Sequence, residues 1–258
     1  MEDWNNMEKG SIQLSKRLQA VAALVPECGC VADIGCDHGY TSIFLVQQGT
    51  AHRAIAMDVR EGPLARAREH ISRQRLEPYI QVRLSDGLEQ LRPGEADAVV
   101  IAGMGGATME KILRAGRPLL EGAVTLALQP QSEIPGFRRF LWQEGYRITR
   151  EDMVLEEGKY YPMMQVRSGS TGPYTAAELA FGPLLLRQRH PVLFQYLNAR
   201  KQLLLEICRQ LQEHGGEKAK GQRMEELAGE LALIEQALWD FYNIGKGNTY
   251  DLPGEDSG

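Results

Sequence analysis

Long apolar runs and cysteines are scarce in this sequence. Its 258 residues include four cysteines, too few for a disulfide scaffold in a chain of this length. No run of about 18 apolar residues indicates a membrane-spanning helix. The first residues, MEDWNNMEKG, are polar and include acids, so they do not predict a signal peptide. We therefore expect a cytoplasmic protein that does not associate with membranes.

The motifs of several enzyme classes are also missing. The sequence contains no Ser-His-Asp set, no metal triad and no G-x-x-x-x-G-K-[ST] phosphate loop. One group of residues could suggest a metal: Cys28, Cys30, Cys36 and His38. The residues between Cys30 and Cys36 read as a strand, which at about 3.3 Å per residue separates the two thiols by roughly 20 Å. Because zinc ligands all lie about 2.0 to 2.3 Å from one ion, we expect no metal site.

The overall charge is not typical of a nucleic-acid-binding protein, but the charges are unevenly distributed. The net charge is −5 and the pI is about 5.7, whereas nucleic-acid-binding domains are usually basic. Residues 187–223 carry eight Lys or Arg against three acids, and residues 224–258 carry one Lys against eight acids. The basic stretch is suited to face phosphates, and the acidic stretch favours solubility.

Strand-like and helix-like patterns alternate along the first part of the chain. Strands are predicted at residues 31–35, 53–58, 80–87, 96–103 and 123–130, and helices at 11–25, 40–48, 63–75, 107–116 and 137–145. This alternation predicts a parallel, doubly wound α/β sheet. Residues 146–169 then hold two strand-like runs joined around Glu157 and Gly158 with no helix between them. They predict an antiparallel hairpin at one sheet edge, as in the Rossmann-like class I methyltransferase fold and unlike a plain dinucleotide-binding domain.

The last third of the chain has a helical pattern from Ala176 to about Ile244. Apolar residues recur at spacings of three and four within residues 190–211 and 224–241, and residues 214–222 separate the two runs. We predict two helices joined by a loop, forming an antiparallel coiled-coil hairpin. The predicted domains are therefore 1–170, 171–247 and a disordered polar tail at 248–258. The hairpin either packs for stability or, through its basic residues, grips a substrate.

Acidic residues follow three of the predicted strands. In an open parallel sheet ligands bind beyond the carboxyl ends of the strands, and the residues found there include Asp33 and Asp37, then Asp58, then Asp86. Asp37 stands where a dinucleotide fingerprint has its second glycine, so a pyrophosphate would meet both a side chain and a negative charge. A cofactor with a cationic end and no phosphate, such as S-adenosylmethionine, fits better than NAD. The strand ending at 103 continues into Gly103-Met104-Gly105-Gly106, where bare backbone would let a flat group approach.

Six motifs follow one another in order along the chain: DIGCDHGY (33–40), AMD (56–58), SDGL (85–88), AGMGG (102–106), LQPQSE (128–133) and EEGKYY (156–161). Together with LSKRL at 14–18 and HPVLFQYL at 190–197, they resemble the bacterial TrmK family of tRNA (adenine-N1)-methyltransferases, which modify adenine 22. The resemblance spans essentially the whole chain. It implies S-adenosyl-L-methionine as methyl donor, a tRNA substrate and a C-terminal coiled-coil domain, and we expect a monomer.

The resemblance also implies roles for individual residues. The methionine part of the donor would be surrounded by Asp33, Gly35, Asp37, His38 and Gly39, its ribose would meet Asp58, and its adenine would meet Asp86 and Gly87. Gly103 and Gly105 complete the expected cofactor site, and Tyr40 and Met104 are the expected catalytic residues. Gly106 would face the target base, and the basic pattern adds substrate contacts at Arg187, Arg189, Arg200, Lys201, Lys218 and Lys220.

Two alternatives stay open on the residues alone. A small-molecule methyltransferase with the same fold would leave the basic hairpin without a role. A non-catalytic tRNA-binding protein could have kept the shape of the cofactor pocket. Methyl incorporation into RNA distinguishes the three hypotheses.

Overall fold

The computed structural model describes residues 12–120, 122, 124–214 and 217–243, without the side chains of residues 214, 217–220 and 222. The predicted tail at 248–258 lies outside these residues. The chain divides between Pro173 and Tyr174 into two compact units, which we describe separately. Within the described residues, no helix is both long and apolar enough to cross a membrane.

The first unit is built on a seven-stranded sheet of order β3-β2-β1-β4-β5-β7-β6. The strands are β1 Cys28–Ile34, β2 Ala51–Asp58, β3 Ile80–Leu84, β4 Ala98–Met104, β5 Thr125–Pro130, β6 Tyr146–Glu156 and β7 Lys159–Ser168. The first five pair in parallel, whereas β7 pairs antiparallel with both β5 and β6. The predicted parallel sheet with a terminal antiparallel hairpin is confirmed.

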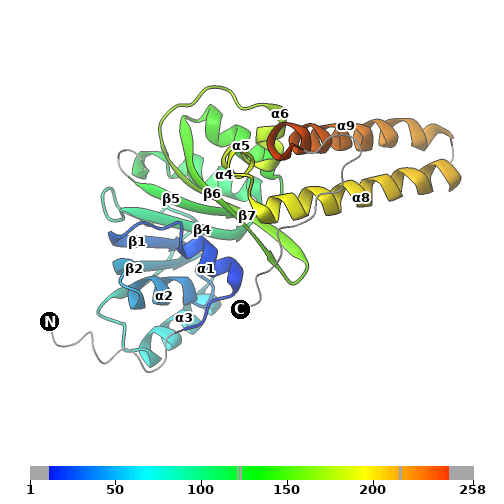
Figure 1. Cartoon of the computed structure of the whole chain (residues 1–258). Coiled ribbons are helices and arrows are strands. Elements are labelled where there is room, and N and C mark those ends of the chain that lie inside the picture. The colour runs from blue at the N-terminus through cyan, green and yellow to red at the C-terminus, as the bar shows by residue number, and fades with distance from the viewer. Residues whose placement is uncertain (1–11, 121, 123, 215–216, 244–258) are drawn as a thin grey trace, which may run out of the picture. The chain divides into compact units, whose positions relative to one another are not determined.

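Helices cover both faces of this sheet (Figure 1). They are α1 Lys16–Ala22, α2 Tyr40–Gln47, α3 Glu61–Arg73, α4 Gly106–Ala115 and α5 Ile134–Gln143, with a 3₁₀ turn η2 at Arg117–Leu119. The strand order grows outward in both directions from β1 and β4, so right-handed crossovers place α2 and α3 on one face and α4 and α5 on the other. The point where the order reverses, between β1 and β4, is where such sheets bind ligands.

The first helix is shorter than the predicted range of 11–25. Ser15 caps its amino end, because the Ser15 side chain accepts a hydrogen bond from the Leu18 amide, and the helix begins at Lys16. The buried face expected of an apolar stripe is present, since Val21 is fully buried and Leu14, before the helix, is also in the core.

The second unit is helical, with α6 Ala176–Phe181, α7 Pro183–Arg187, α8 Pro191–His214 and α9 Glu217–Tyr242. The apolar stripes of α8 and α9 face each other, and Leu197, Leu204 and Ile234 are fully buried. Figure 1 shows the two long helices side by side as a hairpin, as predicted.

The predicted loop at 214–222 is wrong over most of its length, because α9 already begins at Glu217. The segment EKAKGQR consists of good helix formers apart from Gly221, and one glycine costs a helix only about 1 kcal/mol. The continuous helical pattern predicted from Ala176 is also interrupted before Pro183 and Pro191, where Gly182 and Arg189 have positive φ angles.

Candidate active site

A cavity of about 530 Å³ opens at the carboxyl ends of the parallel strands. Its volume falls within the range of roughly 300 to 1,000 Å³ that is usual for small-molecule sites. The structure brings together in its walls ten of the residues predicted for the cofactor and the reaction: Asp33, Gly35, Asp37, His38, Tyr40, Asp58, Asp86, Gly87, Gly103 and Met104. Three predicted residues do not line it: Gly39, Gly105 and Gly106.

The turn after β1 is tied to the neighbouring strand. The amides of Gly35 and Cys36 both donate to the Met57 carbonyl oxygen, at 2.8 and 2.9 Å. Gly35 has a φ of 71° that disfavours any side chain, and a Cβ there would lie 2.2 Å from the Met104 Cε. The turn therefore brings bare backbone and the Met104 thioether together at the cavity wall. Gly39 faces the other way, because a Cβ on it would meet the Ala67 Cβ at 3.1 Å.

Asp33 is a buried acid at the base of the cavity. The Ser42 hydroxyl donates to its Oδ2 at 2.8 Å. Burial raises the pKa of Asp33 to about 6; the Ser42 hydrogen bonds lower it and the Asp58 charge adds to the increase. A cationic ligand in the cavity would stabilise the ionised form of this carboxyl, so the site is electrostatically prepared for positive charge.

Asp58 ends β2 with a carboxylate that is only partly occupied by the protein. Its Oδ1 accepts a hydrogen bond from the Arg60 amide at 2.9 Å, and the Arg60 Nε lies 3.8 Å from the same oxygen. The side chain is 6% exposed and lines the cavity. This arrangement fixes the carboxylate. Its second oxygen is available to accept a hydrogen bond from a hydroxyl group.

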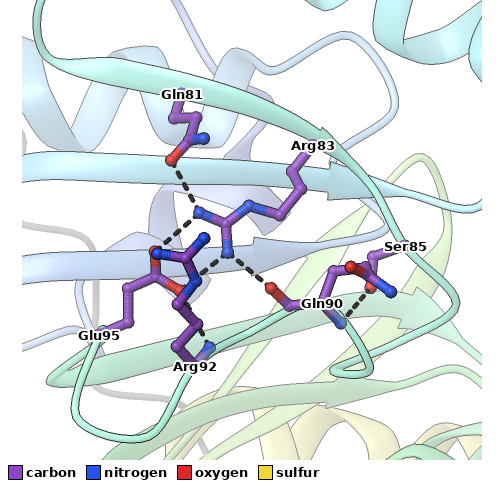
Figure 2. Close-up of polar contacts among 6 residues, drawn as sticks. All are labelled: Gln81, Arg83, Ser85, Gln90, Arg92 and Glu95. Atoms are coloured by element: carbon purple, nitrogen blue, oxygen red, sulfur yellow. Dashed lines mark hydrogen bonds and ion pairs between the residues drawn. The ribbon is translucent and has the colours of Figure 1, made fainter.

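The segment after β3 is held by an ion pair that Figure 2 shows in detail. The two terminal nitrogens of Arg83 donate to the two carboxylate oxygens of Glu95 at 2.7 and 2.8 Å, and also to the Gln81 Oε1 and the Gln90 carbonyl, both at 2.7 Å. The Arg92 amide donates to Glu95 as well. The hydrogen bond from Arg83 lowers the pKa of Glu95 to about 2. The pair therefore closes the loop that carries Asp86.

Ser85 and Gly87 shape the wall inside that loop. The Ser85 hydroxyl donates to the Gly87 carbonyl at 2.9 Å and accepts from the Gln90 amide at 3.2 Å. Asp86 between them is exposed and lines the cavity. Gly87 also lines the cavity, but a Cβ on it would first meet the protein itself, at 3.0 Å from the Ile112 Cγ1.

The two halves of the glycine segment 103–106, at the end of β4, have different surroundings. Gly103 has a φ of 81° at a register shift of β4 and lies open toward the cavity. A Cβ on Gly105 would lie 2.9 Å from the Ser132 Oγ, and one on Gly106 would lie 2.8 Å from the Ser132 carbonyl oxygen. The bare backbone at 105–106 thus admits the protein's own 132–137 segment.

Arg17 and Gln131 line the cavity although sequence reasoning did not single them out. The Arg17 Nη1 donates to the buried Gln129 Oε1 at 2.8 Å, and its guanidinium lies 5.5 Å from the centre of the Tyr161 ring. The Glu156 carboxylate accepts from the Lys16 amide at 2.6 Å at the amino end of α1. The motifs LSKRL and EEGKYY, which are far apart in the chain, therefore meet here. That both belong to the set of motifs shared with the TrmK family was the sequence signal that could have pointed to Arg17.

Three of the six predicted substrate-binding cations of the helical unit lie in ion pairs of that unit. Arg187 pairs with Glu178, Arg200 with Glu230 at 2.6 and 2.8 Å, and Lys201 with Glu235 at 3.0 Å. Arg189 occupies a positive-φ turn. The side chains of Lys218 and Lys220 lie outside the described part of the chain. Glu230 and Glu235 lie on α9 and pair with cations of α8, so the positive charge of α8 is partly neutralised.

The described residues contain no group of three or more His, Cys, Asp or Glu placed to hold a metal ion. Cys28, Cys30, Cys36 and Cys208 are free thiols. Burial raises the pKa of the Cys28 and Cys36 thiols, so both are kept as thiols within the fold.

Comparisons with known proteins identify the family of this chain. The profile of a methyltransferase domain family matches residues 14–164. The tRNA (adenine(22)-N(1))-methyltransferase of Bacillus subtilis is 34% identical over 88% of this chain and 98% of its own length. The chain belongs to the TrmK family.

Solved structures of TrmK proteins share the fold over nearly the whole chain. The crystal structure of Bacillus subtilis TrmK has a TM-score of 0.77, is 34% identical and covers 88% of this chain and 99% of its own. The Streptococcus pneumoniae protein Sp1610 in complex with S-adenosyl-L-methionine also has a TM-score of 0.77, at 30% identity, over 88% of this chain and 100% of its own. The expected class I methyltransferase fold with a C-terminal helical hairpin is confirmed as the TrmK fold.

Proposed function

We propose that this protein transfers a methyl group from S-adenosyl-L-methionine to N1 of adenine 22 in tRNA, giving 1-methyladenosine and S-adenosylhomocysteine. The observation that carries this proposal is the coincidence of two findings. The chain matches a tRNA (adenine(22)-N(1))-methyltransferase over 88% of its length, and the strand-end carboxylates of its TrmK motifs meet in one cavity.

The cavity fits this donor by charge and by shape. S-adenosylmethionine supplies an electrophilic methyl group on a sulfonium cation. Asp58 binds the ribose hydroxyls with its available oxygen, and Asp86 with Gly87 flanks the adenine. Asp33 and Asp37 would provide negative potential around the cationic end, with Gly35 and His38 beside them.

Tyr40 and Met104, which line the cavity, are the residues that we propose to meet the target base. N1 of adenine carries a lone pair at pH 7, so no base needs to remove a proton before the attack. The contribution of the protein is to hold N1 in line with the methyl group, which is where most of the acceleration originates. The product ring is cationic, and the carboxylates of the site stabilise the charge as it develops. N1 lies on the pairing edge, so the base must first leave its setting in the tRNA, at a cost of a few kcal/mol.

We propose that the two units divide the work, with residues 1–170 as the methyltransferase domain and residues 171–247 as a helical domain that contacts the tRNA. We propose a monomer that acts in the cytoplasm, where its tRNA substrate is found. Light scattering of the purified protein tests whether it is a monomer, since a mass of 28.8 kDa is then expected.

The deciding experiment is incubation of the full chain with isotopically labelled S-adenosylmethionine and unmodified tRNA. We expect labelled 1-methyladenosine after nucleoside digestion, and none from the same tRNA carrying guanosine at position 22. Asp58→Ala serves as the matched inactive control. Absence of label from every RNA tested would refute the proposal in favour of a small-molecule methyltransferase or a non-catalytic tRNA-binding protein.

A further inference from the structure

Three aromatic side chains from separate elements gather beside the cavity. His38 in the turn and Tyr40 at the start of α2 line the cavity, and His70 reaches them from α3. The ring centroids lie 5.5 Å apart for His38 and Tyr40, 4.7 Å for Tyr40 and His70, and 5.7 Å for His38 and His70. The Tyr40 ring is nearly parallel to both imidazoles, at 18° and 16°. Such separations are in the range of offset stacking.

The three distances form a triangle and not a three-layer stack. Two rings stacked on opposite faces of Tyr40 would lie much farther from each other than from Tyr40, yet His38 and His70 are only 5.7 Å apart. Both imidazoles therefore lie on the same side of the Tyr40 ring. Its other face is covered by neither, and Tyr40 is 38% exposed.

His70 also makes polar contacts with His38 and Tyr40. The His70 Nδ1 lies 3.0 Å from the His38 carbonyl oxygen, which can only accept, so Nδ1 carries the proton. The unprotonated Nε2 of neutral His70 lies 3.5 Å from the Tyr40 hydroxyl. Tyr40 is thus held by a ring contact and by a long polar contact, and His70 is itself anchored to the backbone of the motif turn.

We propose that the face of Tyr40 turned away from the two imidazoles stacks on a purine base of the tRNA, and that His70 is the positioning residue that holds the Tyr40 ring for this contact. The proposal rests on the proposed function and extends it to a residue of α3 outside the motif turn. Every nucleobase has a π face that stacks on an aromatic ring, and this ring lies at the mouth of the cavity that would hold the methyl donor. His70 does not line that cavity, so it acts on the substrate side through Tyr40.

The test compares His70→Ala with His70→Phe, which keeps a ring against Tyr40 but removes both polar contacts. His52, an exposed residue on β2, provides the control variant His52→Ala. For each protein we would measure kcat and the KM for unmodified tRNA, together with the Kd for S-adenosylmethionine by calorimetry. Loss of part of one base-stacking contact predicts that His70→Ala lowers kcat/KM for tRNA by about tenfold. The donor Kd should stay within about twofold of the wild type, because its carboxylates are untouched, and His70→Phe should recover most of the lost kcat/KM.

Three results would overturn the inference. His70→Ala with the kcat/KM of His52→Ala would show that Tyr40 needs no support. If His70→Ala also weakened binding of the donor, the substitution would be acting through the turn at residues 35–39. If His70→Phe did not recover activity, the ring contact between residue 70 and Tyr40 would not be what positions Tyr40. Failure of the proposed function looks different, because the wild-type protein itself would then make no 1-methyladenosine.

Discussion

Replacing Asp33 with asparagine should make the free protein more stable while weakening its hold on the methyl donor. Burial raises the pKa of Asp33 from 3.8 to about 6. One pKa unit corresponds to about 1.4 kcal/mol, so keeping this carboxylate ionised at pH 7.5 costs the folded state up to about 3 kcal/mol. Asparagine removes that cost and keeps an oxygen for the Ser42 hydroxyl, but it adds an amide N–H that needs an acceptor. We therefore expect a net gain of about 1 to 2 kcal/mol in the free energy of unfolding.

The pH dependence gives this prediction its sign. Between pH 3.8 and about 6 the folded protein holds a proton on Asp33 that the unfolded chain has released. Raising the pH through this window therefore destabilises the wild type relative to Asp33→Asn, and the difference should be constant above it. Urea unfolding at pH 4.5, early in this window, and at pH 7.5 measures it, and the stability of Asp33→Asn relative to the wild type should be about 2 kcal/mol greater at the higher pH.

Donor binding should change in the opposite direction. The variant lacks one negative charge beside a cationic ligand, so its Kd for S-adenosylmethionine should rise by about tenfold at pH 7.5. Asp37→Asn is the matched control for stability, since that acid lies in the same turn with a side chain 60% exposed, and its unfolding free energy should change by less than about 0.5 kcal/mol. An Asp33→Asn protein that is less stable at pH 7.5, or that binds the donor as the wild type does, would refute the reasoning.

Three further substitutions test the parts of the fold that position the site. Glu95→Gln breaks the ion pair with Arg83 and should lower the free energy of unfolding at pH 7 by about 1 to 2 kcal/mol. The difference from the wild type should shrink as the pH falls from 4.5 toward 2. Unchanged urea midpoints at pH 7 would contradict this. Arg138 of α5 and Glu151 of β6 form a buried ion pair at 3.0 Å; Arg138→Ala removes its positive charge and should cost about 3 to 5 kcal/mol by denaturant unfolding, whereas Arg138→Met with Glu151→Leu should cost much less. Gly106→Ala drives a Cβ to 2.8 Å from the Ser132 carbonyl and should cost about 1 to 3 kcal/mol; a melting temperature equal to that of the wild type would show that the 132–137 segment yields freely.

The succession of strands along the chain and the acids at their ends could be predicted from the sequence, because both follow from local patterns. Strand and helix periodicity predicted the parallel sheet and its antiparallel hairpin. Parallel strands place their carboxyl ends at one edge, so Asp33, Asp58 and Asp86 could be expected in one cavity before any coordinates were known.

The features that could not be predicted from the sequence depend on contacts between segments that are distant in the chain. Arg200 meets Glu230 and Tyr40 meets His70, each 30 residues away in the chain. A count of basic residues on α8 therefore overstated the charge left for a substrate. Gly105 and Gly106 read as room for a ligand, whereas the space belongs to Ser132, a neighbour that only the folded chain supplies.

The central claim is that a sulfonium donor lies against the carboxylates at the ends of β1, β2 and β3. A crystal structure of the full chain grown with S-adenosylmethionine tests it most directly. We predict ribose hydroxyls within hydrogen-bonding distance of the Asp58 carboxylate and the adenine beside Asp86 and Gly87. A donor bound elsewhere, or a cavity still empty at saturating donor concentration, would contradict the account.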